Sequence, residues 1–272
     1  MTLDLMTETL TEADLNELRA AVRALEGDTF ATRLADLIGR QVQAAGRALP
    51  SPARKLIAKA SESALRAALK VAVKTIDHKV PAKPQVGLHK ALVAASGAAG
   101  GAFGLAALPA ELPVSTTIML RSIAQIARSQ GEDLNTPEAA LACIEVFALG
   151  GHAPGEAGLE SEYFGVRGAL AISLSDSARF ILRHGLANET APVVVRLVSQ
   201  IAARFGVVVG EKLAAQAMPV IGAVGGAVVN LAFVQHFQTV AHGHFTVRRL
   251  ERAYGADLVR FEYERLRNEK TR

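Results

Sequence analysis

The sequence predicts an all-α protein: a single multi-helix bundle with two Gly/Ala-rich central helices. Of the 272 residues, 50% are hydrophobic but only 5% are aromatic, and tryptophan is absent. The apolar residues are mostly Ala, Leu and Val, which favours close-packed helices over a sheet. Helix start and stop signals recur along the chain, whereas no stretch shows the alternating pattern of a strand.

The first 49 residues are expected to form an acidic helical arm in front of an all-α domain at 50–272. Thr11 and Asp14 resemble a capping box that opens a helix ending near Gly27, and Asp28 can cap a second helix. The arm holds eight acidic residues against five arginines. A single cysteine and an acidic N-terminus favour a cytoplasmic location.

The charge reverses over residues 51–83, which hold eight basic and two acidic residues. Ser51 and Pro52 mark a helix start, and neither Pro nor Gly recurs before Pro81, so we expect a helix over 52–76. At about 100° per residue, five basic residues share one face and apolar residues lie opposite. We call these five residues the cationic face: Lys55, Lys59, Arg66, Lys70 and Lys74.

Two interpretations of the cationic face stay open. It is either the solvated outside of a bundle or a surface that docks on an anionic membrane or a membrane protein. No aromatic residue interleaves the lysines, so nucleic acid is not an expected partner.

Proline and glycine divide the rest of the chain into further helices. These are predicted over residues 85–108, 114–130, 137–149, 160–185, 190–215, 218–240 and 245–268. The last two are separated by an expected break at Gly243.

Two long segments contain no Asp, Glu, Lys or Arg: residues 91–110 and residues 213–247. Small residues recur in both at helical spacing, which allows close helix packing. The glycines concerned are Gly97, Gly101, Gly104, Gly222 and Gly226. We expect the two segments to pack together, either as a buried central pair or as a hairpin in which 91–110 and 213–235 enter a membrane.

The sequence contains no phosphate-binding loop, zinc-protease motif or nucleophile elbow. Cys143 is expected to be a buried small hydrophobe. His236, His242 and His244 surround Gly243, where a helix break could direct imidazoles towards a zinc ion; the alternative is that they cap a helix end. No cofactor follows from these residues alone.

Two other groups of polar residues are candidates for a site. His152 with Glu156, Glu160 and Glu162 could hold a metal or provide a general base, although an exposed acidic loop is the default interpretation. Glu111 lies between two prolines, and we expect it to cap the following helix and pair with Arg121.

Several sequence blocks resemble the EcsC protein family. They are Leu108-Pro-Ala-Glu-Leu-Pro113, Ser115-Thr-Thr-Ile-Met-Leu-Arg121-Ser-Ile-Ala, Gly131-Glu-Asp-Leu, Pro137-Glu138, Val146-Phe-Ala-Leu-Gly-Gly151, Tyr163-Phe164, and Met218-Pro-Val-Ile-Gly-Ala-Val-Gly-Gly-Ala227 with Asn230. The resemblance covers roughly residues 50–265 and implies a bacterial protein associated with membrane transport, with no catalytic residues to carry over.

The leading functional hypothesis is a non-enzymatic accessory protein on the cytoplasmic face of the membrane, bound to lipid or to a transporter. The alternative is a metal-dependent hydrolase that uses a His/Glu site.

Overall fold

A computed structural model confirms the all-α prediction: its described part contains nine helices and no strand. The structure describes residues 9–27, 29–38, 50–74, 108–151, 162–185, 191–216 and 222–270. The helices are α1 (Glu12–Leu25), α2 (Phe30–Ile38), α4 (Ser51–Lys74), α6 (Leu108–Ser129), α7 (Pro137–Leu149), α8 (Glu162–His184), α9 (Pro192–Gln216), α10 (Gly222–Tyr254) and α11 (Ala256–Lys270).

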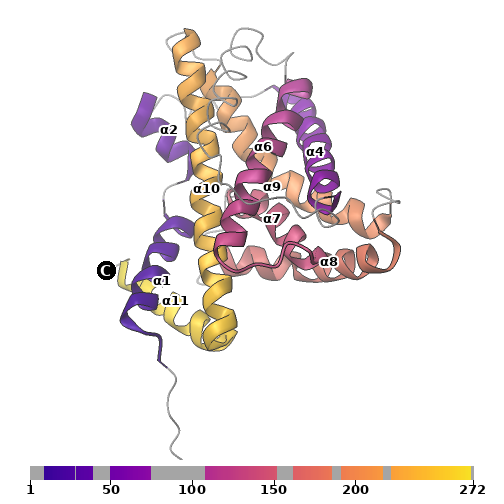
Figure 1. Ribbon diagram of the computed structural model, residues 1–272. Helices are drawn as coiled ribbons and strands as arrows, with labels where there is room; N and C mark the ends of the chain where they lie inside the picture. Colours follow the sequence, from indigo (N-terminus) through magenta and orange to yellow (C-terminus); the bar gives the residue numbers. More distant parts are fainter. Residues whose placement is uncertain are drawn as a thin grey trace, which may run out of the picture.

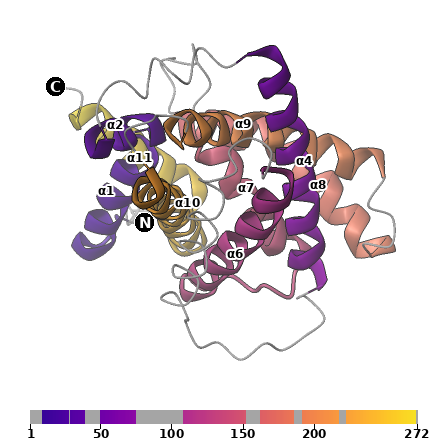
Figure 2. The same ribbon diagram turned by 90° about the horizontal axis from the view of Figure 1, so that it is seen from above.

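Helix α10 forms the axis of the bundle (Figures 1 and 2). Its 33 residues make it about 50 Å long. Helices α1 and α2 lie along one side of it, and α6, α7 and α9 lie along the other. Helix α4 packs outside α6, α7 and α9, while α8 packs on α7 and α9, and α11 lies against α1 and α10. One apolar core joins these helices, from Leu18 of α1 to Leu266 of α11.

Helix α7 is the most enclosed of the described helices, and its bounds match the predicted 137–149. Thr136 is the N-cap, and its side-chain oxygen accepts a hydrogen bond from the backbone N–H of Ala139 at 3.3 Å. Pro137 occupies the first turn, and Gly150 ends the helix. Every residue of α7 except Glu138 is buried.

Helix α6 corrects one predicted boundary. Pro113 predicts a start at 114, but the helix begins at Leu108 and continues through Pro113. A proline this close to a helix start removes one backbone hydrogen bond. The side chains of Leu108 and Leu112 are buried and hold this turn in the core despite the missing hydrogen bond.

Helix α10 corrects a second boundary, because the expected break at Gly243 does not occur. Gly243 is buried inside the continuous helix, where α1 packs closely against it. The helix ends instead before Gly255, whose φ of +87° is a conformation that favours glycine. From Gly222 onwards, the uncharged segment that began at 213 is therefore part of the central helix of the bundle. Residues 91–107 of the segment that we expected to pack against it lie outside the described residues.

Helices α1 and α4 follow their predictions more closely. Thr11 is the N-cap of α1, accepting from the backbone N–H of Asp14 at 3.2 Å, and the helix ends two residues before Gly27. Helix α4 covers nearly all of the predicted 52–76.

Candidate functional site

Helix α4 turns most of the cationic face outward. Lys55, Lys59 and Lys70 are exposed, and Arg66 is half-buried; the side chain of Lys74 lies outside the described residues. The opposite side of the helix is locked into the core by a row of small and apolar residues. The buried members of that row are Ala53, Ile57, Ala60, Ser61, Ala64, Leu65, Ala68, Leu69 and Ala72.

The positive charge of α4 is only partly compensated. Its one acidic residue, Glu62, lies 2.6 Å from the guanidinium of Arg66. Lys55 and Lys59 form no ion pair within the part of the chain that the structure describes. The N-terminal half of α4 therefore presents to solvent positive charge that no carboxylate among the described residues pairs with.

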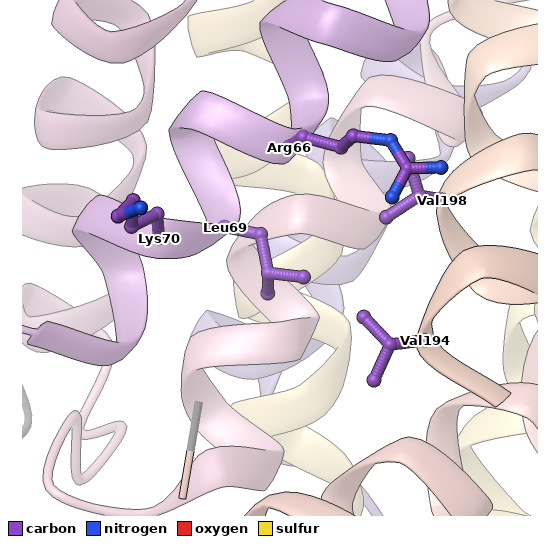
Figure 3. A pocket seen from close by; sticks show the side chains of 5 residues that line it. All are labelled: Arg66, Leu69, Lys70, Val194 and Val198. Carbon is purple, nitrogen blue, oxygen red and sulfur yellow. The ribbon is translucent and has the colours of Figure 1, made fainter. Parts of the chain in front are cut away.

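A small hollow lies between α4 and α9 (Figure 3). It is lined by Arg66, Leu69 and Lys70 of α4 and by Val194 and Val198 of α9, and the side chain of Arg66 points from α4 towards Val198. The hollow has a cavity volume of about 10 Å³, roughly the space of one water molecule. Small-molecule sites occupy at least about 300 Å³, so this hollow is too small for a typical substrate.

A second polar constellation lies inside the bundle, where α7, α8 and α10 meet. The Tyr163 hydroxyl and His244 Nδ1 are 3.0 Å apart, and Arg167 donates to the same hydroxyl at 3.3 Å. On the other side of the imidazole, Nε2 of His244 lies 3.8 Å from Oε2 of Glu145. We call Arg167, Tyr163, His244 and Glu145 the interior relay.

Burial sets the charge states of the interior relay. It raises the pKa of Glu145 to about 7, against the opposing effect of Arg167 and Arg248. Burial, together with the same two arginines, lowers the pKa of His244 well below its ordinary value. The imidazole is therefore neutral at pH 7, where Glu145 is close to half-protonated.

A third polar contact closes one end of the bundle. Nζ of Lys212 on α9 lies 2.8 Å from Oε1 of Glu111 on α6, and Lys212 is 1% exposed. The ammonium also lies 5.0 Å from the ring centroid of Phe233. The expected pairing of Glu111 with Arg121 is wrong: Arg121 is exposed, whereas the buried Lys212 requires a carboxylate.

The three histidines of the predicted zinc site have separate surroundings because α10 is continuous. Nε2 of buried His236 lies 2.8 Å from the carbonyl oxygen of Gly150, and His244 belongs to the interior relay. His242 is exposed. Within the described ranges no group of three or more His, Cys, Asp or Glu side chains is placed to hold a metal ion.

Most other residues that the sequence singled out fall outside the described residues. This applies to Gly97, Gly101, Gly104, His152, Glu156 and Glu160. Of the rest, Glu162 lies 3.3 Å from the guanidinium of Arg204. Gly222 is the first residue of α10, and Gly226 is buried in it. Cys143 is buried as expected, which raises the pKa of its thiol to about 12.

Sequence reasoning missed Glu145, although a signal was present. It is the one charged residue between Ala139 and Leu149, an apolar run that matches a fully buried helix. The end of α7 is capped by α9 and α10. His236 contacts the Gly150 carbonyl, which agrees with the alternative that the histidines cap a helix end. The bond from Arg204 Nε to the carbonyl of Ala148 at 3.3 Å was not predicted.

Of the described helices, α9 has the length and apolar composition to cross a bilayer, and half of its most apolar stretch is buried among other helices. A core helix of a bundle meets the same criteria.

Comparison with known proteins assigns the family. No curated protein and no solved structure matches this chain significantly. The sequence model of the EcsC protein family matches residues 12–250, a range that includes α1 and α2 as well as the motifs from Leu108 onwards. The chain therefore belongs to the EcsC protein family.

Proposed function

We propose that this protein is a non-enzymatic accessory protein that binds the anionic cytoplasmic surface of a membrane through the cationic face of α4. The observation that carries the proposal is the exposure of Lys55 and Lys59 without an ion pair among the described residues. Each cation close to an anionic bilayer contributes about 1 kcal/mol.

The packing of α4 supports a peripheral mode of binding. Its apolar side is buried against α6, α7 and α9, so the helix offers lipid its charge rather than its apolar face. Binding of this kind depends on headgroup charge and is weakened by salt.

Vesicle flotation of the full chain tests this proposal. We expect binding to phosphatidylcholine vesicles that contain phosphatidylglycerol, no binding to phosphatidylcholine alone, and release at high salt. The double variant Lys55→Gln/Lys59→Gln is expected to bind up to about 30-fold more weakly, the equivalent of about 2 kcal/mol.

A matched control removes the same charge elsewhere. Arg23 on α1 and Arg128 near the end of α6 are both exposed, and Arg23→Gln/Arg128→Gln lowers the net charge by the same amount. This control is expected to bind nearly as well as the unmodified chain. Equal weakening in both variants would show dependence on net charge alone, and absence of binding to anionic vesicles would refute the proposal. Binding to native membranes but not to protein-free vesicles would refute it in favour of a membrane protein as the partner.

A further inference from the structure

One hydrogen bond of the interior relay, the bond from Arg167 to Tyr163, has a fixed direction. Arg167 is held by Glu251 through two hydrogen bonds of 2.7 and 3.0 Å, and it reaches the Tyr163 oxygen at 3.3 Å. Because a guanidinium only donates, the phenol oxygen accepts this bond. The hydroxyl hydrogen of Tyr163 is then available to donate to Nδ1 of His244 at 3.0 Å.

When Tyr163 donates to Nδ1, the tautomer of His244 is fixed. With Nδ1 accepting from Tyr163, the single proton of the neutral imidazole is on Nε2. That nitrogen is buried and has no hydrogen-bond partner, and the nearest acidic oxygen is Oε2 of Glu145 at 3.8 Å. A small approach of the two side chains would turn this contact into a hydrogen bond once the carboxylate is ionised.

The phenol oxygen also permits the opposite direction. It has two lone pairs, so it can accept from Arg167 and from a protonated Nδ1 of His244 at the same time. In that arrangement Nε2 is unprotonated and can accept a hydrogen bond from a neutral Glu145. The hydroxyl hydrogen of Tyr163 then has no acceptor, which costs free energy. Only the hydrogen bond from a protonated Glu145 to Nε2 offsets this cost, so the arrangement is confined to conditions in which Glu145 is protonated.

We propose that the interior relay is a proton-operated switch, in which protonation of Glu145 moves the imidazole proton of His244 from Nε2 to Nδ1. The net reaction takes up one proton from water. Glu145 changes from ionised to neutral, and His244 keeps one proton and stays uncharged. In the hydrogen bond between Tyr163 of α8 and His244 of α10, the donor changes from the phenol hydroxyl to Nδ1 of the imidazole.

The charges around Glu145 place this switch near neutral pH. Burial raises the pKa of Glu145, Arg167 of α8 and Arg248 of α10 lower it, and Glu251 of α10 raises it, with a balance of about 7. Glu132 compensates Arg248 through hydrogen bonds of 2.8 and 3.0 Å. On the α9 side, Arg204 donates to the carbonyl of Ala148 at the end of α7.

Nitrogen-15 NMR of the histidine side chains in the full chain tests the switch, because Nδ1 and Nε2 have different shifts in each tautomer. His244→Gln identifies the His244 signals among those of the seven histidines. We expect the two His244 shifts to exchange identities with one midpoint between about pH 6 and 8. In Glu145→Gln the tautomer is expected to stay constant over this range.

Glu211→Gln is the matched control. Glu211 of α9 also has a pKa raised to about 7 by burial, but its hydrogen bond is to the backbone of Ala31 rather than to a histidine. Its loss is expected to leave the midpoint of His244 unchanged. If Glu145→Gln does not fold, the carboxyl carbon-13 shift of Glu145 is followed against pH in the unmodified chain instead. This shift is expected to change with the same midpoint as the His244 tautomer. A constant His244 tautomer in the unmodified chain, formation of an imidazolium, or a midpoint unrelated to Glu145 would overturn the proposal.

Discussion

Gly243 of α10 faces Leu25 of α1 with no space for a side chain between them. A Cβ atom at Gly243 would lie 2.8 Å from Cγ of Leu25 and 3.2 Å from the carbonyl oxygen of Ala21. Gly243→Ala is therefore expected to separate α1 from α10 and to lower the free energy of unfolding by about 1–3 kcal/mol. Urea unfolding followed by circular dichroism measures this change.

Gly168 of α8 provides the opposite case for the same substitution. A Cβ atom there would meet nothing within 4 Å. Gly168→Ala is expected to raise the free energy of unfolding by up to about 1 kcal/mol, because alanine loses less backbone entropy in a helix. Similar effects of the two substitutions would show that Gly243 is not a contact glycine.

These glycines show where prediction of the fold succeeded and where it could not. Helix α7 was predicted to the residue because Thr136, Pro137 and Gly150 act within one turn of its ends. Gly243 lies between two helical patterns, which is also how a glycine that ends a helix looks in a sequence. Its actual role depends on α1, more than 200 residues earlier in the chain, and no local pattern records that packing.

Lys212 and Glu111 form the most buried ion pair among the described residues, and we expect their substitutions to be strongly non-additive. Lys212→Met leaves the Glu111 carboxylate nearly buried without its partner, which is expected to cost about 3–5 kcal/mol. Adding Glu111→Gln removes that charge and is expected to restore much of the loss. Unfolding of the two single variants and the double variant measures the coupling.

The control for this pair is Arg265, which bridges Glu262 and Glu269 on the exposed face of α11. Arg265→Met is expected to cost less than about 1 kcal/mol, since solvent screens exposed pairs. Additive effects at Lys212 and Glu111 would contradict the buried pair.

His236 is expected to stabilise the end of α7 rather than to bind zinc. His236→Phe keeps an aromatic ring beside Phe237 but removes the contact with the Gly150 carbonyl, at an expected cost of about 1–3 kcal/mol. His242→Gln, at an exposed position on the same helix, is expected to have little effect. A raised unfolding temperature on addition of zinc, lost in His236→Phe, would contradict this role and support a metal site.

The candidate sites differ in how far the sequence could indicate them. The cationic face belongs to one helix, so periodicity alone predicted the outward positions of Lys55, Lys59 and Lys70. The interior relay assembles Glu145, Tyr163 and His244 from three helices. Nothing in the spacing of these residues signals their contact, and the expected break at Gly243 directed His244 towards a different group of partners.

Glu211 is expected to make stability fall with rising pH. The pKa of Glu211 is near the ordinary 4.5 in the unfolded chain, and burial raises it to about 7 in the folded chain. Between these values the folded state binds more protons than the unfolded state, so the free energy of unfolding decreases as pH rises through this window. The shift corresponds to at most about 3 kcal/mol, fully developed above pH 7. Glu145 adds a contribution of the same sign, whereas His244, whose lowered pKa keeps the imidazole neutral in the fold, adds one of opposite sign below about pH 6.5. Glu211→Gln is therefore expected to remove only the fall in stability that Glu211 itself causes between about pH 5 and pH 8. Urea unfolding at about pH 5 and pH 8 measures this change in the free energy of unfolding.

Glu269→Gln on the exposed surface is the control and should leave the change in stability with pH as it is. An undiminished change in Glu211→Gln would show that Glu211 ionises in the fold as it does in water.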